Sequence, residues 1–122
     1  MQKASDTYIA RAHFHRGGVE AMPFADASFD KVITCNTVYF WTSLTAGMAE
    51  IARVLAPGGR VVIGFLPKER MDRMNMPADI FTSCTPEDIQ RAMAAAGLTN
   101  PRIEKPTPAT AWAVAVAQRS GP

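Results

Sequence analysis

The sequence predicts an α/β domain whose sheet is mainly parallel and ends in an antiparallel hairpin. Apolar, β-branched runs alternate along the chain with segments of helical periodicity, which is the pattern of an α/β layered fold. The last two strand-like segments are separated only by a turn that contains Pro106 and Pro108, as in a hairpin. A chain of 122 residues has the length of one domain with a hydrophobic core. We therefore expect a single domain over residues 1–122.

The first predicted unit is a strand, a helix and a second strand between Lys31 and Phe65. The apolar run Val32 to Cys35 indicates a buried strand. The segment LTAGMAEIARVL has the 3,4 spacing of a helix, which we expect to stop at Pro57. The pair Gly58-Gly59 permits a sharp turn into the strand RVVIGF. The helix would bury one stripe and turn Glu50 and Arg53 outward; the stripe consists of Leu44, Met48, Ile51, Ala52 and Leu55.

The second predicted helix lies in TPEDIQRAMAAAGL and carries its own start and stop signals. Thr85 is the expected N-cap, Pro86 lies in the first turn, Asp88 follows three residues after the cap, and Gly97 ends the helix. Its buried stripe would be Ile89, Ala92, Met93 and Ala96. The segments RIEK and AWAVAVA then form the hairpin, and a further short strand is expected in AHFHR near residues 12–16.

Composition excludes several classes of function. Thirteen basic and eleven acidic residues are scattered along the chain and give a net charge of only +2, so we expect no nucleic-acid binding. The longest apolar run is too short to cross a bilayer, so we expect no membrane segment. Cys35 and Cys84 lack metal-ligand neighbours and are interpreted as free thiols of a cytoplasmic protein. His13 and His15 have no third ligand, so no metal is expected.

Several segments in one order carry a resemblance to a known family. The order is GGVEAMPF, ADASFD, KVITCNTVYFW, a helix, and then RVLAPGGRVVIGF. This composite resembles the second half of a class I S-adenosylmethionine-dependent methyltransferase, of the small-molecule type found in ubiquinone and menaquinone biosynthesis, over roughly residues 12–119. The resemblance implies a Rossmann-like sheet and methyl transfer from S-adenosylmethionine to a small-molecule acceptor.

The resemblance also implies which residues face the cofactor. In the family, the segment like GGVEAMPF lies against adenine, so Gly18, Val19 and Glu20 would bind that end of the cofactor. Asn36 and Thr37, which follow the fourth strand of the family, would approach the methionine end or the substrate. The family often has an acidic residue at the position of Gly18, which leaves backbone groups or Glu20 for the adenine amino group.

The family's glycine-rich cofactor loop does not occur in this sequence. No G-x-G is present among its eight glycines. We therefore interpret residues 1–122 as an N-terminally truncated methyltransferase domain with weak or absent activity of its own. Loss of the family's first strand would leave Lys31 to Asn36 as an exposed apolar edge. The chain's own N-terminal segment, a second copy in a homodimer, or a separate polypeptide with the missing half would have to cover it.

Other features have two interpretations each. Tyr39 is either packed at a strand-to-helix corner or oriented toward an acceptor, and we favour packing. The methionine-rich run ERMDRMNMP is either a lid or a buried amphipathic turn. Asp26 and Asp30 are interpreted as turn residues, and Glu20 is either a solvated carboxylate or a cofactor contact. For the whole chain, the alternative to an enzyme is a non-catalytic half-domain that dimerises or binds a partner.

Overall fold

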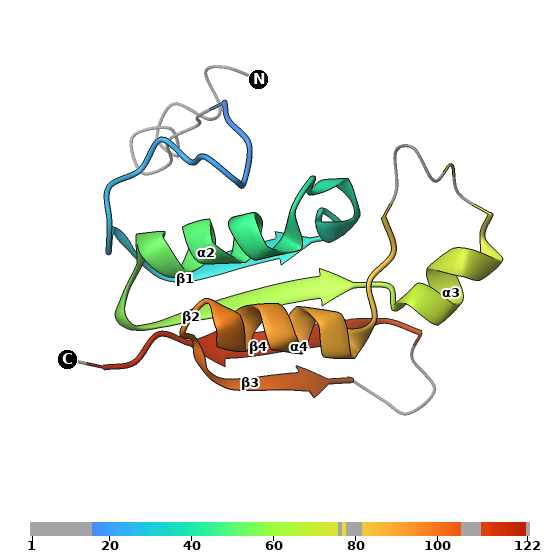
Figure 1. The fold of residues 1–122 in the computed structure, drawn as a ribbon. Coiled ribbons are helices and arrows are strands. Elements are labelled where there is room, and N and C mark those ends of the chain that lie inside the picture. The colour runs from blue at the N-terminus through green and yellow to red at the C-terminus, as the bar shows by residue number, and fades with distance from the viewer. Residues whose placement is uncertain (1–15, 76, 78–81, 106–110, 122) are drawn as a thin grey trace, which may run out of the picture.

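The computed structural model describes residues 16–75, 77, 82–105 and 111–121 (Figure 1). These residues form one sheet, three α-helices and one 3-10 helix. The elements are, in chain order, β1 (Phe29–Cys35), η1 (Val38–Phe40), α2 (Leu44–Val54), β2 (Leu55–Phe65), α3 (Lys68–Arg73), α4 (Pro86–Ala95), β3 (Thr99–Glu104) and β4 (Ala113–Gln118).

The four strands lie in the order β1-β2-β4-β3. β1 and β2 are parallel, whereas β4 pairs antiparallel with both β2 and β3. β1, β2 and β3 therefore run in the same direction, and β4 alone runs against them. This arrangement confirms the predicted α/β class and the C-terminal antiparallel hairpin. Because β4 lies between β2 and β3, its reversed direction makes two of the three pairings antiparallel.

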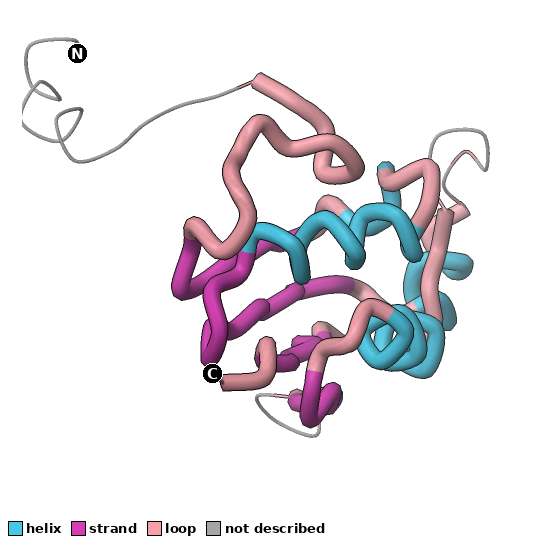
Figure 2. Tube along the Cα trace, turned by 60° about the vertical axis from the view of Figure 1, so that its left-hand side comes forward, coloured by secondary structure: helices cyan, strands magenta, loops and turns pink. Residues whose placement is uncertain are grey.

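The helices α2 and α4 cover one face of the sheet (Figure 2). That face contributes fully buried side chains from the central strands, namely Val61, Ile63, Phe65, Ala113, Ala115 and Ala117. The helices contribute Met48, Ile51, Ile89 and Met93, which are equally buried. Burial of a side chain of this size is worth about 1.5–3 kcal/mol. The predicted stripes of both helices thus meet the sheet in one hydrophobic core.

Helix α4 begins as the sequence predicts. The Thr85 hydroxyl accepts from the Asp88 backbone N–H at 3.0 Å, and the Asp88 carboxylate accepts from the Thr85 N–H at 3.1 Å. This reciprocal capping box satisfies two backbone donors that a helix start otherwise leaves free. Gly97 then adopts a φ of 84° after the last helical turn.

Helix α2 ends earlier than predicted, at Val54 rather than at Pro57. The physical reason is that Leu55 pairs with Phe29 and so becomes the first residue of β2. Arg119 stabilises this end, because its guanidinium donates to the carbonyls of Ala52 and Arg53 at 3.3 Å each. The glycine pair, predicted as the helix-to-strand turn, therefore lies in an irregular part of β2.

The expected burial of the first strand is wrong along its whole length, because no residue of β1 is buried. Cys35 is exposed, and Ile33 exposes 73% of its surface. The reason is that β1 is the last strand of the described sheet, so half of its surroundings lack a neighbour. The predicted exposed apolar edge is therefore present among the described residues. The predicted strand near residues 12–16 falls almost wholly outside the described residues.

Candidate functional site

The chain turns away from the sheet directly after β1. Asn36 takes a left-handed conformation with a φ of 61°, which asparagine tolerates better than most residues. A single turn of 3-10 helix follows, and it buries Tyr39 while exposing Phe40. Ser43 then caps α2 by accepting from the Ala46 N–H at 3.0 Å. This turn carries polar and aromatic side chains past the carboxyl end of β1, where ligands bind in open α/β sheets.

Trp41 lies flat against helix α2 because that helix has a glycine beneath it. A Cβ atom added to Gly47 would lie 2.6 Å from Cε3 of the indole. The side chain of Trp41 is only 8% exposed as a result. The sequence offers a signal for this contact, since a glycine inside a helix costs about 1 kcal/mol and usually has a packing reason.

A loop over residues 17–24 covers this turn, and Glu20 fastens it to the start of α2. The Glu20 carboxylate accepts from the Thr42 hydroxyl and from the Ser43 backbone N–H, both at 2.7 Å. The Thr42 hydroxyl, followed by the Ser43 N–H, lowers the pKa of Glu20. Glu20 is therefore more than a solvated carboxylate, and its charge serves the attachment of the loop.

Glu50 and Arg53 hold the other end of the loop. The Glu50 carboxylate accepts from the Met22 N–H at 2.6 Å and from Arg53 Nε at 2.5 Å. Arg53 also donates to the Met22 carbonyl at 3.1 Å and pairs with Asp26 at 2.7 Å. The helical pattern of the sequence predicts only that Glu50 and Arg53 face outward. Their spacing of three residues predicts that they meet, but nothing local predicts a partner 28 residues away.

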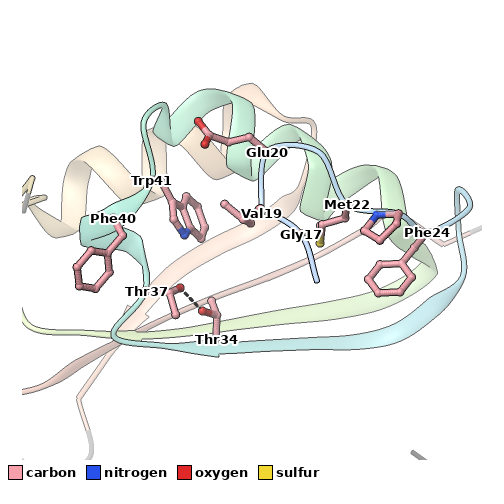
Figure 3. Close-up of a pocket in the computed structure, with 11 residues that line it drawn as sticks. Gly17, Val19, Glu20, Met22, Phe24, Thr34, Thr37, Phe40 and Trp41 are labelled. Atoms are coloured by element: carbon pink, nitrogen blue, oxygen red, sulfur yellow. Dashed lines mark hydrogen bonds between the residues drawn. The ribbon is translucent and has the colours of Figure 1, made fainter. Parts of the chain in front are cut away.

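A cavity of about 550 Å³ lies between the loop and the turn (Figure 3). Its walls are mostly apolar, with two hydroxyl groups, from Thr34 and Thr37, that are hydrogen-bonded to each other at its floor. Figure 3 shows the Glu20 carboxylate turned from the cavity toward α2. The lining residues are Gly17, Gly18, Val19, Glu20, Met22, Pro23, Phe24, Thr34, Thr37, Phe40 and Trp41.

A second cavity of about 350 Å³ adjoins the same turn. Its seven lining residues carry no charged group; they are Asn36, Tyr39, Phe40, Leu66, Met71, Met74 and Trp112. The Tyr39 hydroxyl accepts from the Leu66 N–H and donates to Asn36 Oδ1 at 3.3 Å. Burial raises the pKa of Tyr39 above its usual value. Tyr39 is thus packed and hydrogen-bonded, as the favoured interpretation expected. Met71 is buried, as the buried-turn interpretation expected, and Met74 is 55% exposed. Met76 lies outside the described residues, and the lid stays a prediction.

The structure brings four of the five predicted cofactor residues together. Gly18, Val19, Glu20 and Thr37 line the first cavity, whereas Asn36 lines the second. Phe40 lines both and forms their common wall. Sequence reasoning missed Thr34, which lies in a strand with no polar pattern to mark it. Whether these residues bind a cofactor stays a prediction.

In the parts of the chain that the structure describes, no three His, Cys, Asp or Glu side chains gather as a metal site would require, and His13 and His15 lie outside them. No described helix combines the length and the apolarity that crossing a bilayer demands.

Comparison with known proteins identifies the family. Residues 1–63, just over half of the chain, match the methyltransferase domain family. A malonyl-[acyl-carrier protein] O-methyltransferase from Erwinia pyrifoliae is 39% identical over 64 residues, which are 52% of this chain and 22% of that protein. A ubiquinone/menaquinone biosynthesis C-methyltransferase from Geotalea daltonii is 38% identical over 60 residues, which are 49% of this chain and 26% of the relative.

The fold is that of known methyltransferase structures. A methyltransferase structure from Thermotoga maritima superposes with a TM-score of 0.76 at 19% identity and covers 98% of this chain and 70% of that one. The chain therefore belongs to the class I S-adenosylmethionine-dependent methyltransferase family. Its matched segments span only about a quarter of the length of the two curated relatives.

Proposed function

We propose that the chain takes part in methyl transfer from S-adenosylmethionine to an apolar small-molecule acceptor. The observation that carries the proposal is the common wall of the two cavities, Phe40. A methyl transfer between two bound molecules requires that both be held side by side with water excluded. Two adjoining cavities at the carboxyl end of β1 and β2 support the first part of that requirement, the placement of two molecules side by side.

The first cavity suits the adenosyl part of the cofactor. Its apolar walls, Val19, Met22 and the indole of Trp41, match the faces of a purine, and Thr34 and Thr37 offer hydroxyl groups at the floor. The cofactor would supply the methyl group from its sulfonium. Because Glu20 already accepts two hydrogen bonds, its role here is to fasten the loop that would cover adenine. The sequence has no glycine-rich loop for the remainder of the cofactor, so we expect weak binding and low activity in the chain alone.

The second cavity favours an uncharged, flat acceptor. The two relatives include one named for a malonyl group and one named for quinone biosynthesis. A malonyl carboxylate would need a cationic partner, since an unpaired charge is costly in apolar surroundings, and the seven lining residues provide none. The thioether and aromatic side chains instead match an apolar ring.

Titration calorimetry with S-adenosylhomocysteine tests the cofactor half of the proposal. We expect saturable binding that Thr37→Val weakens by about two- to tenfold, the net worth of one hydrogen bond. Thr45→Val is the matched control, because Thr45 is an exposed residue of α2 outside both cavities. Absence of binding at millimolar ligand would refute cofactor binding by this polypeptide.

Phe40→Ala tests the common wall. The side chain is 55% exposed, so its truncation should leave the fold intact. We expect a weaker affinity for S-adenosylhomocysteine and, with radiolabelled S-adenosylmethionine, less label on quinone-type phenols. If malonyl thioesters rather than phenols accept the label, the apolar-acceptor assignment is wrong.

A second candidate function is a non-catalytic half-domain that binds a partner. The exposed edge of β1, with Ile33 at 73% exposure, favours it. The calorimetric titration separates the two candidates, because a half-domain of this kind would bind its partner without binding S-adenosylhomocysteine.

A further inference from the structure

The first observation concerns the outer edge of β1. Among the described residues β2 is the only strand that pairs with β1. Asn36 donates its N–H inward, to the Gly64 carbonyl at 2.9 Å. Because backbone groups alternate in direction along a parallel strand, Lys31, Ile33 and Cys35 direct their N–H and carbonyl groups outward. A strand edge of this kind is a template for another strand.

The second observation concerns the face of the sheet opposite to α2 and α4. The strand registers place Ile33 beside Val62, and Val62 beside Val116, in one row across three strands. The row lies on the opposite face from the row of Val32, Val61 and Ala117, in which Val61 and Ala117 are fully buried and Val32 is half-buried. Ile33 is 73% exposed and Val62 is half-buried, whereas Val116 is only 6% exposed. The described helices with the main contacts to the sheet, α2 and α4, lie on its other face (Figure 2).

The third observation is a pair of cations in the neighbouring row, two residues earlier along β1 and β2. Lys31 lies beside Arg60 in the register, and both are exposed. Neither belongs to any of the ion pairs found within the described parts of the chain. Two neighbouring cations at the rim of an apolar surface favour an acidic group on whatever covers it.

We propose that this surface binds a second polypeptide that contributes a strand and the helix joined to it. The strand would extend the sheet at β1, and the apolar side of the helix would cover Ile33 and Val62, with an acidic residue near Lys31 and Arg60. A strand alone would leave Ile33 and Val62 exposed, and a helix alone would leave the edge of β1 unpaired. A second copy of this chain, paired edge to edge, would lengthen the sheet and leave its apolar face uncovered. The occupant is therefore a βα-containing partner.

The comparison supports the same occupant. The Thermotoga maritima structure matches 98% of this chain, yet 30% of that protein (100% less the 70% covered) has no counterpart in the match. Thr34 of β1 lines the first cavity, so a strand added to β1 would adjoin that cavity. The surface is thus continuous with the candidate site.

Amide hydrogen exchange of the whole chain, followed by NMR, tests the proposal. The probe is the part of the Geotalea daltonii relative that lies outside the matched segment, expressed separately. In the chain alone, we expect Lys31, Ile33 and Cys35 to exchange quickly and Val32, Thr34 and Asn36 slowly. With the probe, the three outward amides should become protected by about tenfold or more. No cofactor is added, so the result is independent of the proposed function.

Two variants locate the surface. Ile33→Lys should weaken probe binding by about tenfold or more, since it places a charge in the apolar row. Ala94→Lys, which adds the same charge on the exposed side of α4, should change the affinity for the probe by less than about twofold. Lys31→Glu, a second variant that leaves the apolar row unchanged, should also weaken binding, and more so at low salt.

Three results would overturn the proposal. In the first, the probe protects no outward amide at millimolar concentration. In the second, Ile33→Lys and Lys31→Glu, both folded by circular dichroism, bind the probe as well as the natural chain. In the third, the outward amides are already protected in the chain alone. Light scattering would then assign that protection to a second copy if the mass doubles, and to the chain's own N-terminal segment if it does not.

Discussion

Single residues decide the shape of the first cavity, and Gly47 is the clearest of them. Its missing side chain lets the Trp41 indole lie against α2 and form one wall of the cavity. Gly47→Ala would gain about 1 kcal/mol of helix propensity, but forcing a methyl group against the ring costs about 1–3 kcal/mol. We expect a net loss of roughly 1 kcal/mol in the free energy of unfolding, measured by urea denaturation.

The same substitution made with Trp41→Ala provides the control. Without the indole, the new methyl group meets no ring, so Gly47→Ala should raise the free energy of unfolding by about 1 kcal/mol relative to Trp41→Ala alone. A stabilising Gly47→Ala in the natural background would mean that the indole does not pack on α2.

At the scale of elements, helix α4 is the part that the sequence predicts best. Its cap, its buried stripe and its glycine stop are all local signals, and each appears as expected, except that Ala96 at the end of the stripe is only half-buried. Thr85→Ala should lower the free energy of unfolding by about 1 kcal/mol, and Thr85→Ser should restore most of it, as measured in urea. Equal effects of alanine and serine would show that the hydroxyl does not cap the helix.

Helix α2 and strand β1 show where local signals fail. Leu55 fits the helical stripe and is fully buried, but its backbone belongs to β2 because Phe29 pairs with it. Cys35 ends an apolar run, yet it is exposed because β1 has a neighbour on one side only. Both outcomes depend on a partner strand, which the run itself does not encode.

Local sequence signals do not predict the attachment of loop 17–24 to α2 either. Because two carboxylates hold the loop, its attachment depends on pH. Hydrogen bonds from Arg53 and from the Met22 N–H lower the pKa of Glu50, as those from Thr42 and Ser43 lower that of Glu20. A carboxylate with a lowered pKa stabilises the fold above its unfolded pKa of about 4.3 and loses that contribution as the pH falls through its folded value.

We therefore expect the loop to stay attached between pH 7 and 5 and to loosen below about pH 4. Trp41 fluorescence in a Trp112→Phe background reports this change, because Trp41 lies in the same cavity wall. Glu50→Gln should loosen the loop already at pH 7 and flatten the acid transition. If the acid transition of Trp41 fluorescence is unchanged in that variant, Glu50 does not hold the loop.

At the scale of the whole molecule, the two faces of the sheet are unequal. The face toward α2 and α4 holds the core, whereas the face with Ile33 carries an apolar row without a described helix over it. The sequence predicted the exposed edge of β1 from the resemblance to a larger sheet, but the rows of the opposite face follow only from the strand registers. Stability and self-association should therefore depend on different faces of this domain.

Ile33→Lys separates those two properties in the chain by itself. The side chain is 73% exposed, so the charge should change the free energy of unfolding by less than about 0.5 kcal/mol. The same charge on an open strand edge opposes edge-to-edge pairing, so the onset of light scattering on heating should move to higher temperature. Val61→Lys, on the buried face of β2, should instead unfold the domain, because an unpaired charge would enter the core. If Ile33→Lys lowers the free energy of unfolding by several kcal/mol, the side chain is packed in solution, and a second copy or the N-terminal segment already occupies the face that we assign to a partner.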